Sequence, residues 1–333
     1  MPPDRVMTNL TVDDVYAAQR AISPWVRPTP LVHSRALSAR TGASVFLKLE
    51  TVHDAGAFKI RGATNRLVNL GDAEHKRGVV AVSTGNHGRA VALAASRLGV
   101  SATVCVSELV PENKRQAIRA LGADLHVEGK SQDEAEAIAR RLTEEKGLVP
   151  VHPFDDPEVI AGQGTIGLEL LEHPGAVDHL LVGLSGGGLA SGIALALKSV
   201  SPNTRIIGIS MERGPAMIQS VKAEKPVAVA ELPSLADSLG GGIGLDNRYT
   251  FDLVRKYLDD FVLVSEREIA DGMVHLYREE RIIAEGGGAV PVSALLHDKA
   301  GDLGGNVVCI ISGGNVDMGV FAEIVTGRYK FDD

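Results

Sequence analysis

The sequence predicts an α/β fold with mostly parallel, doubly wound sheets, and two observations carry this prediction. Short runs rich in β-branched residues alternate with longer segments whose apolar residues recur at helical spacing. Strands that alternate with helices in this way form parallel βαβ units. The expected strands cover 44–50, 78–83, 101–107, 124–129, 179–185, 204–210, 261–265 and 306–312. The expected helices cover 58–70, 88–98, 112–121, 131–146, 158–172, 189–199 and 266–280, after a first helix capped by Thr11.

Length and composition indicate a soluble globular protein with room for two domains. The chain has 333 residues, of which 44% are hydrophobic and 23% are charged. A net charge of −8 without any basic block argues against a nucleic-acid partner. No segment has the roughly 18 apolar residues of a membrane span, and the first ten residues lack a signal peptide's apolar stretch. Cys105 and Cys309 lie in apolar runs, so we expect reduced thiols in a cytoplasmic protein.

Four loops that follow expected strands are rich in glycine and small polar residues. In sheets of this kind ligands bind at the carboxyl ends of the strands, where such loops gather. We therefore expect all four loops to form one site. They are AGAFKIRGA (55–63), STGNHG (83–88), SGGGLASG (185–192) and SGGN (312–315).

The loop SGGGLASG has the features of a phosphate-binding turn. Three successive glycines let backbone N–H groups point toward one anion beside the N-terminus of a helix. The spacing does not match G-x-G-x-x-G, and no Lys-Ser/Thr pair follows the glycines, so neither a dinucleotide nor a nucleoside triphosphate is indicated. A tight strand-to-helix turn without a ligand is the alternative.

The other three loops each offer a group that has both a chemical and a structural interpretation. Lys59 follows Phe58 and suits a Schiff base with an aldehyde cofactor, although a lysine at a helix start is commonly solvated. The loop at 83–88 can bind a carboxylate and a ring hydroxyl, or can simply cap a helix. Ser312 supplies a neutral hydroxyl or a polar turn. His87 is a possible general base, although a histidine bonded to the backbone is the better interpretation.

Together these loops resemble the second fold type of pyridoxal-phosphate (PLP) enzymes, and more narrowly the threonine dehydratase and serine racemase family. The resemblance covers about residues 30 to 320 and rests on several strings in the family's order. It implies two domains, each with a mostly parallel twisted sheet flanked by helices. The larger would comprise 1–78 and 156–333, and the smaller 79–155. The matching strings are AGAFKIRGATN (55–65), STGNHGRA (83–90), HPFDDPEVIAGQGTIGLEL (152–170), SGGGLASG (185–192) and SGGNVDM (312–318).

The resemblance assigns roles to individual residues. Lys59 would form the imine with PLP and act in catalysis together with Thr84, while Phe58 flanks the cofactor. Asn86 would bond the 3′-hydroxyl of the ring, and Ser312 would face its pyridine nitrogen. The phosphate loop would be Ser185, Gly186, Gly187, Gly188 and Leu189. The substrate carboxylate would be held by Ser83, Thr84, Asn86 and His87.

Several positions depart from the racemase pattern. Racemases carry a serine where Thr84 stands, so Thr84 favours elimination over racemisation. The racemases' metal-binding carboxylates correspond to Ser210 and Ala216, so no metal site is expected, although Glu212 lies nearby. The strings ADSLGGGIGLDN (236–247) and SMERGPAM (210–217) resemble dehydratases of hydroxyectoine utilisation.

The predicted function is thus a PLP-dependent dehydratase, or ammonia-lyase. It would eliminate water from a β-hydroxy amino acid similar to threonine or serine, giving a 2-oxo acid and ammonia, with a place in hydroxyectoine catabolism. We expect a homodimer or higher homo-oligomer whose other partner is the small-molecule amino acid. The alternatives are an amino-acid racemase or a β-replacement synthase on the same scaffold, and a non-catalytic PLP-binding protein.

Overall fold

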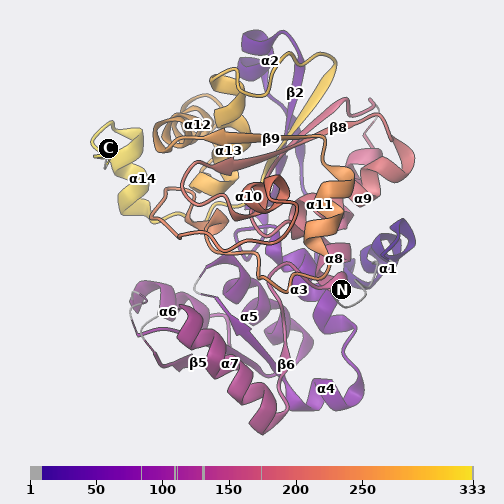
Figure 1. Cartoon of the computed structure of the whole chain (residues 1–333), viewed down its shortest axis with the longest axis vertical. Helices are drawn as coiled ribbons and strands as arrows, with labels where there is room; N and C mark the ends of the chain where they lie inside the picture. Colours follow the sequence, from indigo (N-terminus) through magenta and orange to yellow (C-terminus); the bar gives the residue numbers. More distant parts are fainter. Residues whose placement is uncertain are drawn as a thin grey trace.

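A computed structural model describes residues 10–83, 85–108, 110, 112–129, 132–173 and 175–331, and it contains two sheets (Figure 1). The first has six strands in the order β1-β2-β10-β7-β8-β9, and the second has four in the order β5-β4-β3-β6. Every pair is parallel except β1 with β2. The prediction of an α/β protein with two mostly parallel, helix-flanked sheets is confirmed.

The expected strands lie close to their predicted positions, and every residue after the first is buried in β7, β8 and β10. The six-stranded sheet comprises β1 (Leu31–His33), β2 (Ser44–Leu49), β7 (His179–Gly183), β8 (Arg205–Met211), β9 (Asp260–Val264) and β10 (Asn306–Ile311). The four-stranded sheet comprises β3 (Val79–Val82), β4 (Ala102–Val106), β5 (Asp124–Val127) and β6 (Val149–Pro150).

The helices include all those expected from the sequence and several more. The expected ones are α1 (Val12–Ile22), α3 (Lys59–Val68), α5 (Asn86–Leu98), α6 (Glu112–Arg119), α7 (Gln132–Lys146), α8 (Pro157–Leu171), α9 (Gly188–Val200) and α12 (Glu266–Arg278). Six further helices were not expected from the sequence: α2 (Arg35–Thr41), α4 (Asp72–Arg77), α10 (Ala216–Lys222), α11 (Thr250–Tyr257), α13 (Gly286–Leu296) and α14 (Met318–Val325). The short strands β1 and β6 were not expected either. Two 3₁₀ turns complete the series, η1 (Glu50–Val52) and η2 (Asp237–Leu239).

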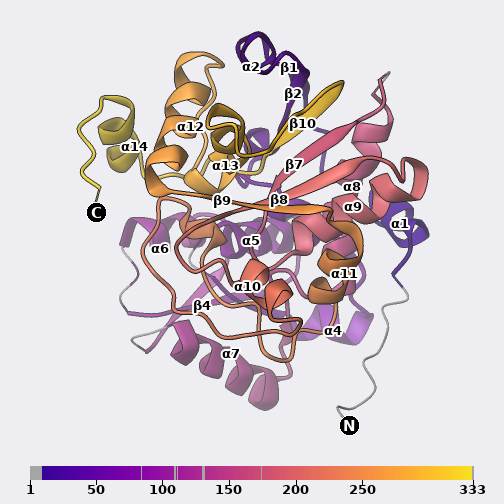
Figure 2. The same ribbon diagram turned by 45° about the horizontal axis from the view of Figure 1, so that its top comes forward.

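The apolar core divides according to the two sheets. The six-stranded sheet is covered on one side by α12 and α13 and on the other by α8 and α9, and each interface holds a cluster of fully buried aliphatic side chains (Figure 2). The four-stranded sheet packs against α5 and α7, with α3 beyond α5. The helix α13 is buried along almost its whole length, as expected of a helix that is apolar all round. Cys105 and Cys309 are free and buried in different sheets.

The chain enters and leaves the four-stranded sheet beside α3 and α8, which lie near the middle of the view in Figure 1. All four of its strands come from residues 79–150, inside the segment expected to form the smaller domain. The segment that leads from β6 back to α8 is held in place at both ends. Val151 N–H donates to Val80 O (2.9 Å), and the Asp155 carboxylate accepts from the backbone N–H groups that begin α11.

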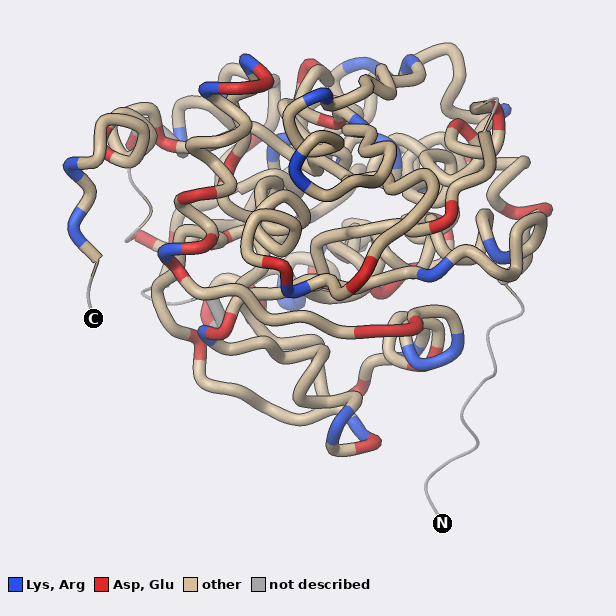
Figure 3. The backbone as a smooth tube through the Cα atoms, turned by 90° about the horizontal axis from the view of Figure 1, so that it is seen from above, with Lys and Arg blue, Asp and Glu red and all other residues tan. Residues whose placement is uncertain are grey.

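Charged residues of both signs are spread along the described chain (Figure 3). Among the described residues, no helix has the length and the apolar character that crossing a membrane requires.

Candidate functional site

Three of the four glycine-rich loops contact one another, as the sequence predicted, and the fourth is linked to them through Pro153 and Phe154. The N-termini of α3, α5 and α13 lie beside the carboxyl end of β10. Phe58 N–H donates to Ser312 O (3.0 Å), which joins the start of α3 to the end of β10. Asn86, the first residue of α5, donates from Nδ2 to Glu285 Oε1 (2.7 Å) just before α13. The site therefore combines residues from both sheets.

Lys59 is the first residue of α3 and is only partly exposed. Its Nζ donates to the carbonyl oxygen of Pro153 (2.5 Å) and lies 5.3 Å from the centre of the Phe58 ring. Burial lowers the pKa of Lys59 from 10.5 to about 8, and the negative charge of Glu285 opposes part of that effect. An amine with such a pKa is partly unprotonated near neutral pH and can act as a nucleophile or a base.

The glycine loop before α9 accepts no side chain. A Cβ on Gly186 would lie 2.3 Å from the Phe154 ring, and one on Gly188 would lie 2.9 Å from Phe154 O. Gly187 caps α9 with φ of 90°, a left-handed conformation that favours glycine. Leu189 is buried and Ser185 is partly exposed. The loop thus presents backbone at the N-terminus of a helix, the arrangement that binds anions.

Asn86 takes part in a buried polar network. Its Oδ1 accepts from Asn315 Nδ2 (2.7 Å), and the same Asn315 amide donates to Ala55 O (2.8 Å). With one N–H of Asn86 directed to Glu285, the second N–H of its amide has no partner among the residues that the structure describes and can donate to a ligand. The network joins three of the four loops and fixes the orientation of Asn86.

Glu285 is a residue that the sequence analysis missed. It is the N-cap residue of α13, its side chain is buried, and a Cβ on Gly313 would lie 2.8 Å from its Oε1. Burial raises the pKa of Glu285 to about 7, and the negative charge of Asp237 adds to the rise, while hydrogen bonds from Asn86 and Ser238 lower it. The sequence signal was available, because Glu285 directly precedes three glycines.

The substrate loop is only partly described. Ser83 Oγ accepts from Gly85 N–H (3.2 Å), whereas Thr84 lies outside the described residues. His87 is buried, and its Nε2 donates to Val151 O (2.8 Å). Burial lowers the pKa of His87 to about 3, and the positive charge of Lys59 adds to the effect. This histidine is neutral and bonded to backbone, which matches the structural interpretation of His87.

Ser312 directly follows β10 and is buried, and its hydroxyl donates a long bond to Gly287 O (3.5 Å). A Cβ on Gly288 would lie 2.6 Å from Gly313 O, so the glycines of α13 allow the SGGN loop to lie against the helix. The neutral hydroxyl therefore lies among the same groups as Asn86 and Glu285.

The segment that returns from the small sheet crosses this site. Pro153 accepts the bond from Lys59, and Phe154 lies over the glycine loop. His152 Nδ1 accepts from the N–H groups of Phe154 (3.2 Å) and Asp155 (2.7 Å), which shapes the turn. Its ring is also in edge contact with the ring of Phe154.

The residues considered for a metal site are buried or lie near another charged group. Ser210 and Ala216 are buried, and Glu212 Oε1 lies 3.7 Å from the ammonium of Lys299. The described part of the chain has no group of three or more potential side-chain ligands that could hold a metal ion.

The chain is similar in sequence and in fold to known proteins. Residues 22–313 match the family model described as "Pyridoxal-phosphate dependent enzyme". An L-threonine ammonia-lyase of Thermotoga maritima is 43% identical over 95% of this chain and 78% of its own length. Among solved structures, maize serine racemase has a TM-score of 0.89 and 34% identity, covering 96% of this chain and 98% of that one. Threonine deaminase isoform 2 of Solanum lycopersicum has a TM-score of 0.87 and 33% identity, covering 96% and 94%.

Proposed function

Because the chain belongs to the family of pyridoxal-phosphate-dependent enzymes, we propose that it removes water from a β-hydroxy amino acid and releases a 2-oxo acid and ammonia. The observation that carries the proposal is the position of Lys59. Its amine has a lowered pKa and lies where a glycine loop at a helix N-terminus and two polar loops converge.

The residues present fit the cofactor. Only glycine is tolerated at positions 186 and 188, and left-handed Gly187 opens α9, so a phosphate can approach the backbone there. Asn86 retains an N–H for a ring hydroxyl, and Ser312 offers a neutral partner for a ring nitrogen. Lys59 supplies the amine that the cofactor's aldehyde requires. The expected binding residues are therefore kept as the proposed set: Phe58, Lys59, Asn86, Ser185, Gly186, Gly187, Gly188, Leu189 and Ser312.

When bound, the cofactor supplies an electron sink that makes the α-proton of the substrate acidic. The task of Lys59 is to hold and move a proton at Nζ. With a pKa of about 8, the unprotonated amine can take the α-proton near neutral pH, so that the β-hydroxyl can leave as water. The bond to Pro153 O holds Nζ in place while the amine is free.

Ser312 and Glu285 set the electrostatics around the ring position. A serine at the ring nitrogen does not force a proton onto it, as a carboxylate would, and this favours elimination over transamination. Glu285 orients Asn86 through a charge-assisted hydrogen bond. Phe154 lies over the glycine loop.

Elimination rather than racemisation is supported by two observations. Thr84 replaces the serine of the racemases, and its branched side chain restricts the rotamer and adds bulk. The relative from Thermotoga maritima is named for ammonia release. We further propose a substrate from hydroxyectoine utilisation, on the strength of the segment 236–247, in which Ser238 donates a hydrogen bond to Glu285.

The test is a turnover assay of the purified holoenzyme with threonine, serine, 3-hydroxyaspartate and amino acids derived from hydroxyectoine. We expect 2-oxo acid and ammonia in equal amounts from at least one of them, formed much faster than the opposite enantiomer appears on chiral chromatography. Faster racemisation of serine than deamination of every substrate would replace the dehydratase by the racemase. Turnover of threonine or serine alone would remove the hydroxyectoine assignment.

A further inference from the structure

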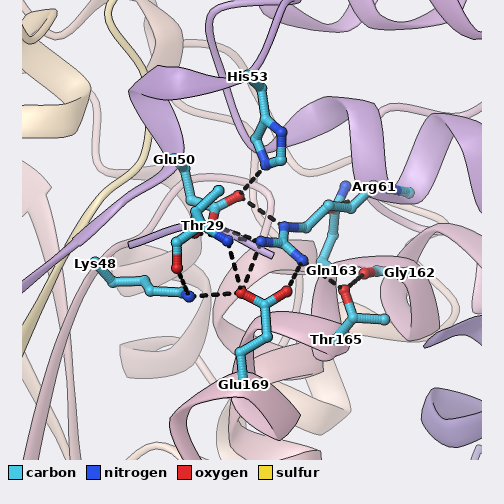
Figure 4. Close-up of polar contacts among 10 residues, drawn as sticks. Thr29, Lys48, Glu50, His53, Arg61, Gly162, Gln163, Thr165 and Glu169 are labelled. Carbon is cyan, nitrogen blue, oxygen red and sulfur yellow. Dashed lines mark hydrogen bonds and ion pairs between the residues drawn. The ribbon is translucent and has the colours of Figure 1, made fainter. Parts of the chain in front are cut away.

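Two residues along α3 from Lys59, Arg61 belongs to a buried cluster of charged side chains that the proposed chemistry does not use (Figure 4). Four Asp, Glu, Lys or Arg residues are buried in the described part of the chain: Lys48, Glu50, Arg61 and Glu285. Glu285 belongs to the site already described. The other three form one cluster with Glu169 of α8. Of these residues, Arg61 is only two positions from Lys59 in the sequence. Buried charge is thus concentrated around the Lys59 turn.

Arg61 is the centre of this cluster, and all its N–H donors are engaged. One edge of the guanidinium donates to both oxygens of Glu50, from Nε (2.7 Å) and Nη2 (2.9 Å). The other edge donates to both oxygens of Glu169, with Nη2 at 3.1 Å, and Nη1 also donates to Thr165 Oγ1 (3.1 Å). These two bidentate contacts, one at each of two edges of the guanidinium, fix both its position and its plane.

The two carboxylates are in turn anchored to other parts of the large sheet. Lys48 of β2 donates to Glu169 Oε2 (2.5 Å) and to Thr29 O (2.6 Å), and the Thr29 hydroxyl donates to Glu50 Oε1 (2.6 Å). Burial by itself would raise the pKa of Glu50, but the adjacent Arg61 charge holds it well below its usual range. Both carboxylates are therefore held in place by contacts that connect β2, η1 and α8.

The cluster acts on the turn that carries Lys59. Residues 59 and 61 are about 200° apart around a helix, so Arg61 is directed into the core when Lys59 is directed into the site. Next along α3, Gly62 N–H donates to Gln163 Oε1 of α8 (3.2 Å), and a Cβ on Gly162 would lie 2.7 Å from Gly62 Cα. The first turn of α3 is held by the Arg61 cluster and by this close crossing, with no room to rotate.

Stability alone is a poor explanation for such a cluster. Replacing a buried ion network with apolar side chains of similar volume is often neutral or stabilising, because taking charges out of water is costly. A bidentate network does what apolar packing does not: it specifies one orientation of the group that it holds. The orientation matters most where a reacting atom is two residues away.

We propose that Arg61, through its paired contacts with Glu50 and Glu169, is a positioning residue that sets where the amine of Lys59 stands. This inference rests on the proposed role of Lys59. The cluster fixes the rotation of the first turn of α3, and that rotation places Nζ at Pro153 O and beside the cofactor site.

The test is Arg61→Lys, which keeps the charge but loses the planar fork. We expect kcat to fall on the order of 10- to 100-fold with little change in KM, because small displacements of a reacting group have effects of this size. In the cofactor-free protein, the extent of Lys59 acetylation is measured by peptide mass mapping as a function of pH. The midpoint of this titration should shift from about pH 8 toward pH 10.5. A merely structural role would not move that titration.

Phe321→Leu is the matched control. Phe321 is buried in α14, far along the chain from the cluster, so the variant loses stability without touching α3. It should keep the kcat and the Lys59 titration of the wild type. If Arg61→Lys does not fold, Glu169→Gln removes one of the two carboxylates and should change kcat and the titration in the same direction. Wild-type values in a folded variant, or the same losses in Phe321→Leu, would overturn the positioning role.

The proposed function and the positioning role of Arg61 can be refuted independently of each other. Attachment of the cofactor to a lysine other than Lys59 in the wild type would refute the proposed function whatever Arg61→Lys does. Attachment to Lys59 together with an unaffected Arg61→Lys variant would refute the positioning role alone.

Discussion

At the scale of single residues, the site depends on how the charge of Glu285 acts on Lys59. Both have pKa values displaced toward neutrality by burial, to about 8 and about 7. The residual charge of Glu285 keeps the Lys59 pKa higher than burial alone would. This pair was not foreseen from the sequence, because a single glutamate before a glycine run does not show which lysine it will lie near.

Removing the charge of Glu285 should therefore lower the pKa of Lys59. In Glu285→Gln, we expect the midpoint of Lys59 acetylation in the cofactor-free protein to fall below about 8, since burial remains and the opposing charge is gone. Glu280→Gln, at a carboxylate bonded to Ser34 on another part of the protein, is the control and should leave the midpoint unchanged. An equal or higher midpoint in Glu285→Gln would show that the two groups are not coupled.

At the scale of elements, sequence patterns located those that are long and regular. The strand at 306–311 and the helix at 132–146 lie within one residue of their expected ends. The helix α13 was missed because Gly286, Gly287, Gly288 and Pro291 have poor helix propensity. Tertiary contacts explain these glycines: a Cβ on Gly286 would lie 2.2 Å from Leu235 O, and one on Gly288 2.6 Å from Gly313 O. Packing, which the local sequence does not show, overrides propensity here.

The glycine loop before α9 gives a prediction at the same scale. In Gly187→Asp the backbone must keep a φ of 90°, and the new carboxylate would repel a phosphate bound at the helix N-terminus. We expect the cofactor dissociation constant to rise by at least 100-fold, an energy of about 3 kcal/mol, measured by titrating the cofactor-free protein with PLP.

Gly301→Asp provides the control for backbone strain. Gly301 also has a positive φ, of 76°, with nothing within 4 Å of an added Cβ. This variant should bind the cofactor as the wild type does. Full cofactor occupancy in Gly187→Asp after purification would show that the loop does not hold the phosphate.

At the scale of the whole molecule, the site exists because two sheets place their helix N-termini together. The position of the glycine loops at the carboxyl ends of strands is predictable from the sequence, because it follows from parallel βαβ units. Contacts such as Asn86 with Glu285, 199 residues apart, or Lys59 with Pro153, 94 residues apart, are not predictable in this way. Such contacts depend on how the two sheets pack, and that packing has no local signature.

The return segment shows the same limit. Its string HPFDDP was recognised, but its place over Lys59 and the glycine loop follows from three bonds between Asp155 and the start of α11, a helix that the sequence analysis missed. The extent of the domains, the oligomeric state and the location in the cell stay predictions.

The central claim is that Lys59 holds the cofactor, and borohydride reduction tests it most directly. The wild-type holoenzyme is reduced, digested and mapped by mass spectrometry, beside Lys59→Ala treated in the same way. We predict a single pyridoxyl-modified peptide, labelled at Lys59, and no label together with loss of the visible absorbance in Lys59→Ala. A label on any other lysine of the wild type would contradict the assignment of the site.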